Sequence, residues 1–177
     1  MKTKNMINTE LNLCINEDEW IPALPDYEKI SSKIVKLAVN HAEKRNPSEL
    51  SKLQKTLSFN LCLSNNEEVQ ALNKEFRGKD KPTNVLSFAN IDDCDFERYA
   101  QQYPIVEMGD IIIALQTMQQ EALEKKINLH NHFCHLLTHG ILHLLGYDHI
   151  DDKDADYMEN LEIEILRQIN IDNPYKE

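Results

Sequence analysis

The feature that most constrains this chain is a cluster of histidines, because six of its seven histidines lie between His130 and His149. His139 and His143 are four residues apart, so on a helix their rings stand one turn apart on the same face. Gly146 can adopt the left-handed conformation that ends a helix, and His149 then returns toward the pair. Three imidazoles around an open fourth position are typical of a catalytic zinc site. The spacing therefore predicts a helix, a glycine stop and a zinc ion held by His139, His143 and His149.

The spacing His-x-x-x-His-x-x-Gly-x-x-His is that of the metzincin proteases, with one large difference. Those enzymes place a glutamate directly after the first histidine as the general base, whereas this chain has Gly140 there. A peptidase would therefore lack its usual base, while the metal ligands are retained. The sequence predicts a metzincin-like zinc site that does not serve an ordinary protease.

Histidines at helical spacing can also be core or surface residues, and a bare pair four residues apart favours that interpretation. The third histidine and the turn glycine make a metal site the favoured interpretation instead. For the other histidines we expect His135 to orient a ligand or to pack, and His130 and His132 to be cap or surface residues. Asp148 either orients a ligand or caps the following helix, and the sequence favours neither alternative.

Apolar periodicity places strands and helices alternately along the chain. It predicts strands at 57–63, 85–88 and 110–114, and helices at 26–45, 129–145 and 152–169, with further helices after Ser64 and after residue 114. Ser64 and Glu67 form a predicted capping box. Residues 91–103 are expected to form an acidic loop, and residues 1–25 give no clear prediction. These elements predict an α+β fold, with one small mixed β-sheet covered by helices.

Length and composition predict an ordinary globular protein. A chain of 177 residues suffices for one compact domain, so we expect residues 1–177 to form a single domain. No apolar run reaches the roughly 18–20 residues that span a bilayer, and the first residues lack the pattern of a signal peptide. We therefore expect a cytoplasmic protein without a membrane partner, whose four widely spaced cysteines are reduced.

The net charge of the whole chain is opposite in sign to that of one short segment. The net charge of −11 argues against a protein that coats nucleic acid through long-range attraction. The segment 74–81 nevertheless carries Lys74, Arg77, Lys79 and Lys81 against two acidic residues. The guanidinium of Arg77 is always charged and forked, which suits a phosphate, although a solvated basic loop is the alternative. Three of the four glycines of the chain lie within this segment or the histidine segment, which favours phosphate binding.

The string from His139 to His149, His-Gly-Ile-Leu-His-Leu-Leu-Gly-Tyr-Asp-His, resembles the signature of the YbeY family of bacterial rRNA maturation factors. Two further segments are similar to that family. One is 73–88, which contains Arg-Gly-Lys-Asp-Lys-Pro-Thr-Asn-Val-Leu-Ser-Phe, and the other is Gly109-Asp110-Ile111. Together the matching segments extend over 57–166 in consistent order.

The resemblance implies a single-strand-specific, metal-dependent endoribonuclease that acts in 16S rRNA 3′-end maturation and late ribosome quality control. It also implies one zinc ion per chain on the three histidines, a functional Arg77, and partners in the small ribosomal subunit and its assembly factors. We expect no small-molecule cofactor. Zinc could polarise a phosphoryl oxygen and lower the pKa of a bound water to about 7.

Two rival functions stay open: a metallopeptidase with a remote base, and a non-catalytic ribosome-binding factor whose zinc only stabilises the fold. The nucleophile is also open, because the sequence is compatible with attack by water or by the RNA 2′-hydroxyl.

Overall fold

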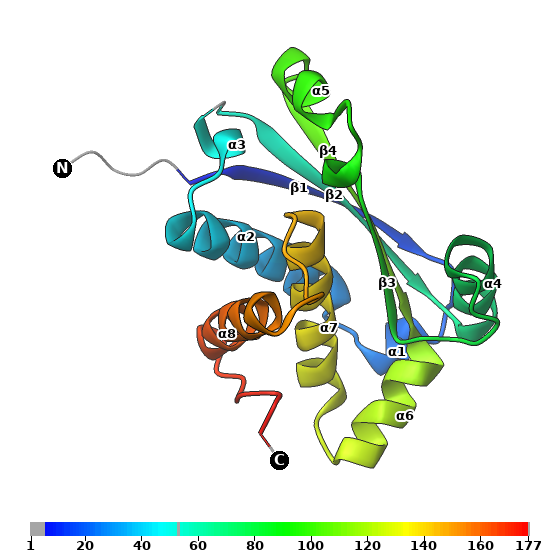
Figure 1. Ribbon diagram of the computed structural model, residues 1–177. Helices are drawn as coiled ribbons and strands as arrows, with labels where there is room; N and C mark the ends of the chain where they lie inside the picture. Colours follow the sequence, from blue (N-terminus) through cyan, green and yellow to red (C-terminus); the bar gives the residue numbers. More distant parts are fainter. Residues whose placement is uncertain (1–5, 53, 177) are drawn as a thin grey trace.

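A four-stranded mixed β-sheet forms the centre of the computed structural model, which describes residues 6–52 and 54–176 (Figure 1). In spatial order the strands are β1 (Asn8–Ile15), β2 (Thr56–Ser64), β4 (Ile105–Ala114) and β3 (Val85–Ala89). The first three run parallel, and the edge strand β3 pairs antiparallel with β4. The predicted α+β class, with one small mixed sheet and covering helices, is confirmed.

Strand β2 shows why the sheet has two different faces. Its alternate residues Leu57, Phe59, Leu61 and Leu63 are at most 1% exposed and belong to the main core, whereas Cys62 packs on the opposite face. This is the period of two that a strand imposes on its side chains. The pairing with β4 shifts register at Gly109, whose φ is +129°. A Cβ there would collide with the carbonyl oxygen of Phe88, so the close approach requires glycine.

The helices form unequal layers on the two faces of the sheet (Figure 1). On the main-core face, α7 packs on β3 and β4, α2 packs on β1 and α7, and α8 packs on α7 and α2, while α4 covers part of the other face. The bounds of these helices are α2 (Tyr27–Arg45), α4 (Asn66–Arg77), α6 (Leu115–Lys125), α7 (Leu129–Leu144) and α8 (Asp152–Arg167). Shorter helical turns are α1 (Trp20–Ala23), α3 (Glu49–Lys52), η1 (Asn90–Asp92) and α5 (Phe96–Gln102). Within the described part of the chain, every helix is too short or too polar to cross a bilayer.

Two segments contain more regular structure than the sequence predicted. Residues 8–15, part of the uninterpreted N-terminal segment, form β1, while residues 1–5 of that segment lie outside the described residues. The prediction of an acidic loop at 91–103 is wrong, because α5 lies there and buries Phe96 and Ala100 against the core. Two apolar side chains one turn apart are enough to dock so short a helix.

The start of α4 differs from the predicted capping box by one residue. The N-cap is Asn65, whose side chain accepts a hydrogen bond from the backbone N–H of Glu68 at 2.9 Å. Ser64 is still paired with Ala114 as the last residue of β2, so its backbone cannot take the cap position. The helix ends at Gly78, which adopts the left-handed conformation with φ 68°. This turn directs the following loop back toward β3.

Candidate metal centre

The C-terminal end of α7 determines where the third predicted ligand lies. The backbone N–H of Tyr147 donates to the carbonyl of Leu142 at 3.0 Å, and that of Gly146 donates to the carbonyl of His143 at 2.9 Å. This pair of bonds, with φ +94° at Gly146, is the Schellman arrangement that ends a helix and reverses the chain. The predicted helix stop at Gly146 is confirmed, and it returns His149 to the helix end.

The structure brings the three predicted ligands together. The Nε2 atoms of His139 and His143 are 3.0 Å apart, and the ring centroid of His149 lies 5.5 Å and 5.0 Å from those two rings. One ring nitrogen from each histidine lies within 4.8 Å of the others. Tetrahedral coordination at Zn–N distances of 2.0–2.1 Å would space two such nitrogens by about 3.3 Å. The cluster therefore has the dimensions of a three-histidine metal site.

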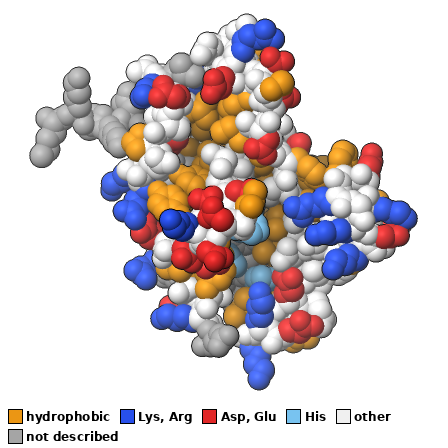
Figure 2. Space-filling view, in the orientation of Figure 1, with side chains coloured by type: hydrophobic (Ala, Val, Ile, Leu, Met, Phe, Trp, Pro, Cys, Tyr) orange, Lys and Arg blue, Asp and Glu red, His pale blue; other side chains and the backbone are white. Residues whose placement is uncertain are grey.

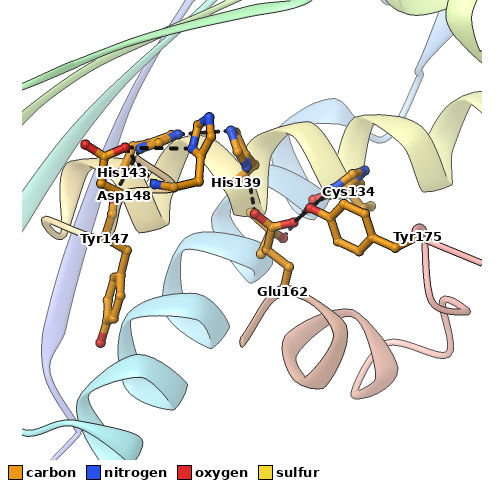
Figure 3. A network of polar contacts seen from close by, with 10 residues as sticks. Cys134, His139, His143, Tyr147, Asp148, Glu162 and Tyr175 are labelled. Carbon is orange, nitrogen blue, oxygen red and sulfur yellow. Dashed lines mark hydrogen bonds and ion pairs between the residues drawn. The ribbon is translucent and has the colours of Figure 1, made fainter. Parts of the chain in front are cut away.

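The outer hydrogen bonds of His139 and His143 support that interpretation. Nδ1 of His143 donates to the carbonyl oxygen of Tyr147 at 3.0 Å, and Nδ1 of His139 donates to Oε1 of Glu162 at 2.6 Å (Figure 3). A carbonyl or a carboxylate can only accept, so each neutral ring carries its hydrogen on Nδ1. Both Nε2 lone pairs then point at one another across 3.0 Å, which is favourable when a cation shares them. The donor set thus fits a metal ion.

The pKa values of His143 and Glu162 are both shifted in a direction that suits a metal site. Burial, and then the neighbouring His139 and His149, lower the pKa of His143 to about 4, so the ring is neutral at pH 7. Burial acts to raise the pKa of Glu162, but hydrogen bonds from His135 and His139 outweigh it and hold that pKa at about 2. Glu162 is therefore an ionised acceptor behind His139, and His143 is a neutral ring on the other side of His139.

A cleft of about 450 Å³ opens above the histidines. In Figure 2 the histidines lie in a hollow beside the lobe that carries many of the lysines and arginines. The cleft is lined by Arg77, Thr83, Asn84, Val85, Ser87, Ala89, Asp92, His139, His143, Gly146, Tyr147, Asp148 and His149. The structure thus places Arg77 in the same cleft as the three histidines, although these residues come from distant parts of the chain.

The other cations of the 74–81 segment do not line this cleft in the described residues. Lys74 is bound to Asp80 at 2.8 Å, and that contact raises the pKa of the lysine. The side chain of Asn73 donates to the carbonyl of Lys81 at 2.8 Å and fixes the loop. Arg77 is therefore the one guanidinium or ammonium group that the cleft presents, within the part of the chain that the structure describes.

A set of hydrogen bonds that the sequence did not reveal joins the loop after Arg77, residues 78–84, to α7. The side chain of Asn84 donates to both oxygens of Glu121 at 3.1 Å and 3.0 Å, and Nε2 of His132 lies 2.7 Å from the same carboxylate. The prediction that His132 is a cap or surface residue is wrong, because its side chain is 1% exposed. Asn84 and Glu121 are 37 residues apart, and no local pattern signals their contact.

Glu162 was also missed, although the sequence contains a signal for it. It stands four residues after Met158 and three before Ile165, so it occupies the apolar face of α8 and is 0% exposed. A charged residue on an otherwise apolar helix face needs a buried partner. Its contact with His135 places this histidine behind His139, on the far side of the carboxylate from the candidate ligands.

The structure also bears on two further predictions: that Gly140 replaces the base of a peptidase, and that Asp148 either orients a ligand or caps α8. A Cβ on Gly140 would lie 3.0–3.2 Å from three side-chain atoms of Ile111 in β4, so this position faces the sheet and leaves no room for a glutamate. Asp148 lines the cleft and accepts from the backbone N–H of His149 at 2.7 Å. The cap of α8 is Asp151, which accepts from the N–H of Asp154, so the capping alternative for Asp148 is wrong.

Comparison with known proteins agrees with the motifs. A family model described as Endoribonuclease YbeY matches residues 13–170. The Endoribonuclease YbeY of Francisella tularensis subsp. tularensis is 48% identical, over 100% of this chain and 96% of that relative. The protein of the same name from Paramagnetospirillum magneticum is 39% identical, over 97% of this chain and 98% of that relative.

A solution structure of a Thermotoga maritima protein has a TM-score of 0.55 and 22% identity, over 94% of this chain and 99% of that chain, which shows a shared fold. The family match covers the strands β2, β3 and β4, the histidine cluster and Arg77. The chain therefore belongs to the Endoribonuclease YbeY family.

Proposed function

We propose that this protein is a zinc-dependent endoribonuclease that cleaves single-stranded RNA, with residues 1–177 acting as one domain. Its proposed role is 16S rRNA 3′-end maturation and late ribosome quality control in the cytoplasm, alongside the small subunit and its assembly factors. The observation that carries the proposal is that Arg77 lines one cleft with His139, His143 and His149. Relatives with the printed name Endoribonuclease YbeY support the reaction class.

In this proposal the three histidines hold the metal in a metzincin-like site. Zinc is the proposed ion because neutral imidazoles suit it and three protein ligands leave a fourth position open. When bound, the ion would supply Lewis acidity toward a phosphoryl oxygen and would lower the pKa of a bound water. Gly140 cannot supply the base that a metzincin peptidase has at this position, so the metallopeptidase alternative requires a base from elsewhere in the chain.

Arg77 is the proposed catalytic residue of the protein itself. Its fork can donate two hydrogen bonds to phosphate oxygens and stabilise the negative charge that develops on them. Asp92 and Asp148 also line the cleft and would repel a phosphate from their side, so the RNA backbone should approach along the Arg77 side. With a net charge of −11, binding to free RNA should be weak, which is why we include ribosomal partners.

The test is cleavage of a single-stranded fragment of 16S rRNA by wild type and Arg77→Ala, each with and without a chelator. We expect Arg77→Ala to keep its zinc and its fold while cleavage falls on the order of 10²–10³. Arg77→Lys should restore little, because an ammonium cannot form the bidentate fork. Arg98→Ala is the matched control, since Arg98 is an exposed arginine of α5 that pairs with Asp95 at 3.3 Å.

Three outcomes would contradict the proposal. Full cleavage by Arg77→Ala would remove this residue from the mechanism. Cleavage that persists in excess chelator would exclude a required metal. Chelator-sensitive hydrolysis of peptides, or RNA binding without cleavage, would favour one of the two rival functions. The chemistry of the product ends would distinguish attack by water from attack by the 2′-hydroxyl.

A further inference from the structure

A buried carboxylate stands directly behind the histidine cluster. Glu162 of α8 is 0% exposed, and both of its oxygens are occupied (Figure 3). Oε1 accepts from Nδ1 of His139 at 2.6 Å, and Oε2 accepts from Nε2 of His135 at 3.0 Å and from the hydroxyl of Tyr175. An ionised carboxylate is costly to bury unless its hydrogen bonds are complete, and these three partners offset that cost.

The two histidines offer different nitrogens to this one carboxylate. His135 uses Nε2, so the nitrogen at the tip of its ring is already engaged. His139 uses Nδ1, so its Nε2 remains directed at Nε2 of His143, 3.0 Å away. His135 and His143 are each four residues from His139, so spacing does not separate them. The hydrogen bonds do separate them, because Glu162 engages Nε2 of His135 but leaves Nε2 of His139 directed at His143.

We propose that Glu162 is the positioning residue that makes His139 a metal ligand, by keeping the ring hydrogen on Nδ1 and the Nε2 lone pair toward His143 and His149. The inference rests on the proposed function only in taking the three-histidine cluster as a metal site. Tyr175, from the segment after α8, extends this role to the C-terminal tail. Its hydroxyl donates to Oε2 and completes the hydrogen bonds of the carboxylate from the side opposite His139.

Two physical effects connect Glu162 with metal affinity. A carboxylate that accepts from Nδ1–H raises the electron density on Nε2, and it prevents rotation of the ring away from the metal. Loss of such an outer partner typically weakens metal binding by 10–100-fold. Glu162→Gln keeps an oxygen for His139 but removes the charge, so its loss should be near the low end of that range. Glu162→Leu removes the acceptor, so its loss should be near the high end.

The test measures Zn²⁺ affinity of the full chain by competition with a chromophoric chelator, which requires no catalytic activity. We expect Glu162→Leu to bind about 100-fold and Glu162→Gln about 10-fold more weakly than wild type. Tyr175→Phe should lose less, in the same direction. Glu164→Gln is the matched control, because Glu164 lies on the same helix and contacts His41 at 2.7 Å, away from the cluster. Its affinity should equal that of wild type.

A second measurement reports the tautomer of His139 in metal-free protein, from its ¹⁵N chemical shifts at neutral pH. Wild type and Glu164→Gln should carry the hydrogen on Nδ1, whereas Glu162→Leu should show a substantial Nε2–H population. A residue that only packs would not shift this equilibrium. Should Glu162→Leu fail to fold, the zinc affinities of Glu162→Gln and Tyr175→Phe test the proposal, because both variants keep an oxygen that accepts from His139.

The two proposals can fail separately. A folded Glu162→Leu protein with wild-type zinc affinity, or with the His139 hydrogen still wholly on Nδ1, would overturn the role of Glu162, and so would wild-type zinc affinity in Glu162→Gln. Wild-type protein that binds no zinc would overturn the proposed metal site, and the tautomer measurement would then decide alone whether Glu162 positions His139.

Discussion

Helix α7 carries a stripe of four histidines, and the two ends of this stripe have different surroundings. Successive ring centroids from His132 through His135 and His139 to His143 are 6.3, 6.5 and 4.5 Å apart. At the N-terminal end, His132 and His135 each place Nε2 against a carboxylate. At the C-terminal end, His139 and His143 place Nε2 against one another. Helical spacing is therefore common to both ends, and the hydrogen-bond partners distinguish a structural histidine from a candidate ligand.

The largest expected effect lies at the C-terminal end of the stripe. His139→Ala and His143→Ala should each reduce zinc affinity by more than the roughly 10–100-fold that loss of an outer partner costs, because a ligand itself is removed. His135→Ala should lower affinity by about 10-fold at most, since it removes one of two donors to Oε2 of Glu162. Metal analysis after dialysis, at matched protein concentration, measures all three. Equal losses from the three variants would mean that the two ends do not differ.

The next effect concerns folding stability at the N-terminal end. Glu121→Ala would leave His132 buried with neither ring nitrogen paired, because its Nδ1 already has no partner among the described residues. It would also release Asn84. We expect the free energy of unfolding to fall by about 1–3 kcal/mol, with zinc affinity unchanged. Urea unfolding monitored by circular dichroism gives the first value, and chelator competition gives the second.

Glu124→Ala serves as the control for this variant, because Glu124 is an exposed residue of the same helix that accepts a hydrogen bond from the side chain of Gln120. Its stability should stay within about 0.5 kcal/mol of wild type. A loss of zinc from Glu121→Ala comparable to that from His139→Ala would join the two ends into one functional unit and refute the distinction.

The same contrast explains what the sequence could predict at the site. The clustering of the three candidate ligands and the helix stop follow from spacing within eleven residues, and local backbone geometry fixes both once α7 forms. Glu121 and Glu162 lie outside that window, and their contacts depend on how α6 and α8 pack against α7. Arg77 was predicted from its chemistry and its resemblance, but only the tertiary fold shows that Lys74 is bound to Asp80 instead of lining the cleft.

The fold shows a similar division. Strand β2 was predictable because four of its alternate residues are leucine or phenylalanine. In β1 the alternation of Leu11, Leu13 and Ile15 with polar neighbours was present but passed unrecognised, because a half-exposed edge strand gives a weaker apolar signal. The helix α5 could not be predicted from its composition, since most of its residues are polar and only Phe96 and Ala100 are buried.

The smallest effect is expected at His130, the first histidine of α7. Its backbone N–H is bound by the side chain of Asn128, which caps the helix without help from the imidazole. The ring itself is 36% exposed and lies 3.4 Å from a carboxylate oxygen of Asp26, which is also exposed. While the imidazole is protonated, an exposed pair of this kind contributes about 0.2–1 kcal/mol and is screened by salt. His130→Ala should therefore lower the free energy of unfolding by at most about 1 kcal/mol, less at 1 M salt, and should leave zinc affinity at the wild-type value. Urea unfolding at low and high salt, with metal analysis of the same samples, checks each part. Loss of zinc from His130→Ala would show that histidines along the whole of α7 contribute to the site, and the structural difference between the two ends of the stripe would then have no functional counterpart.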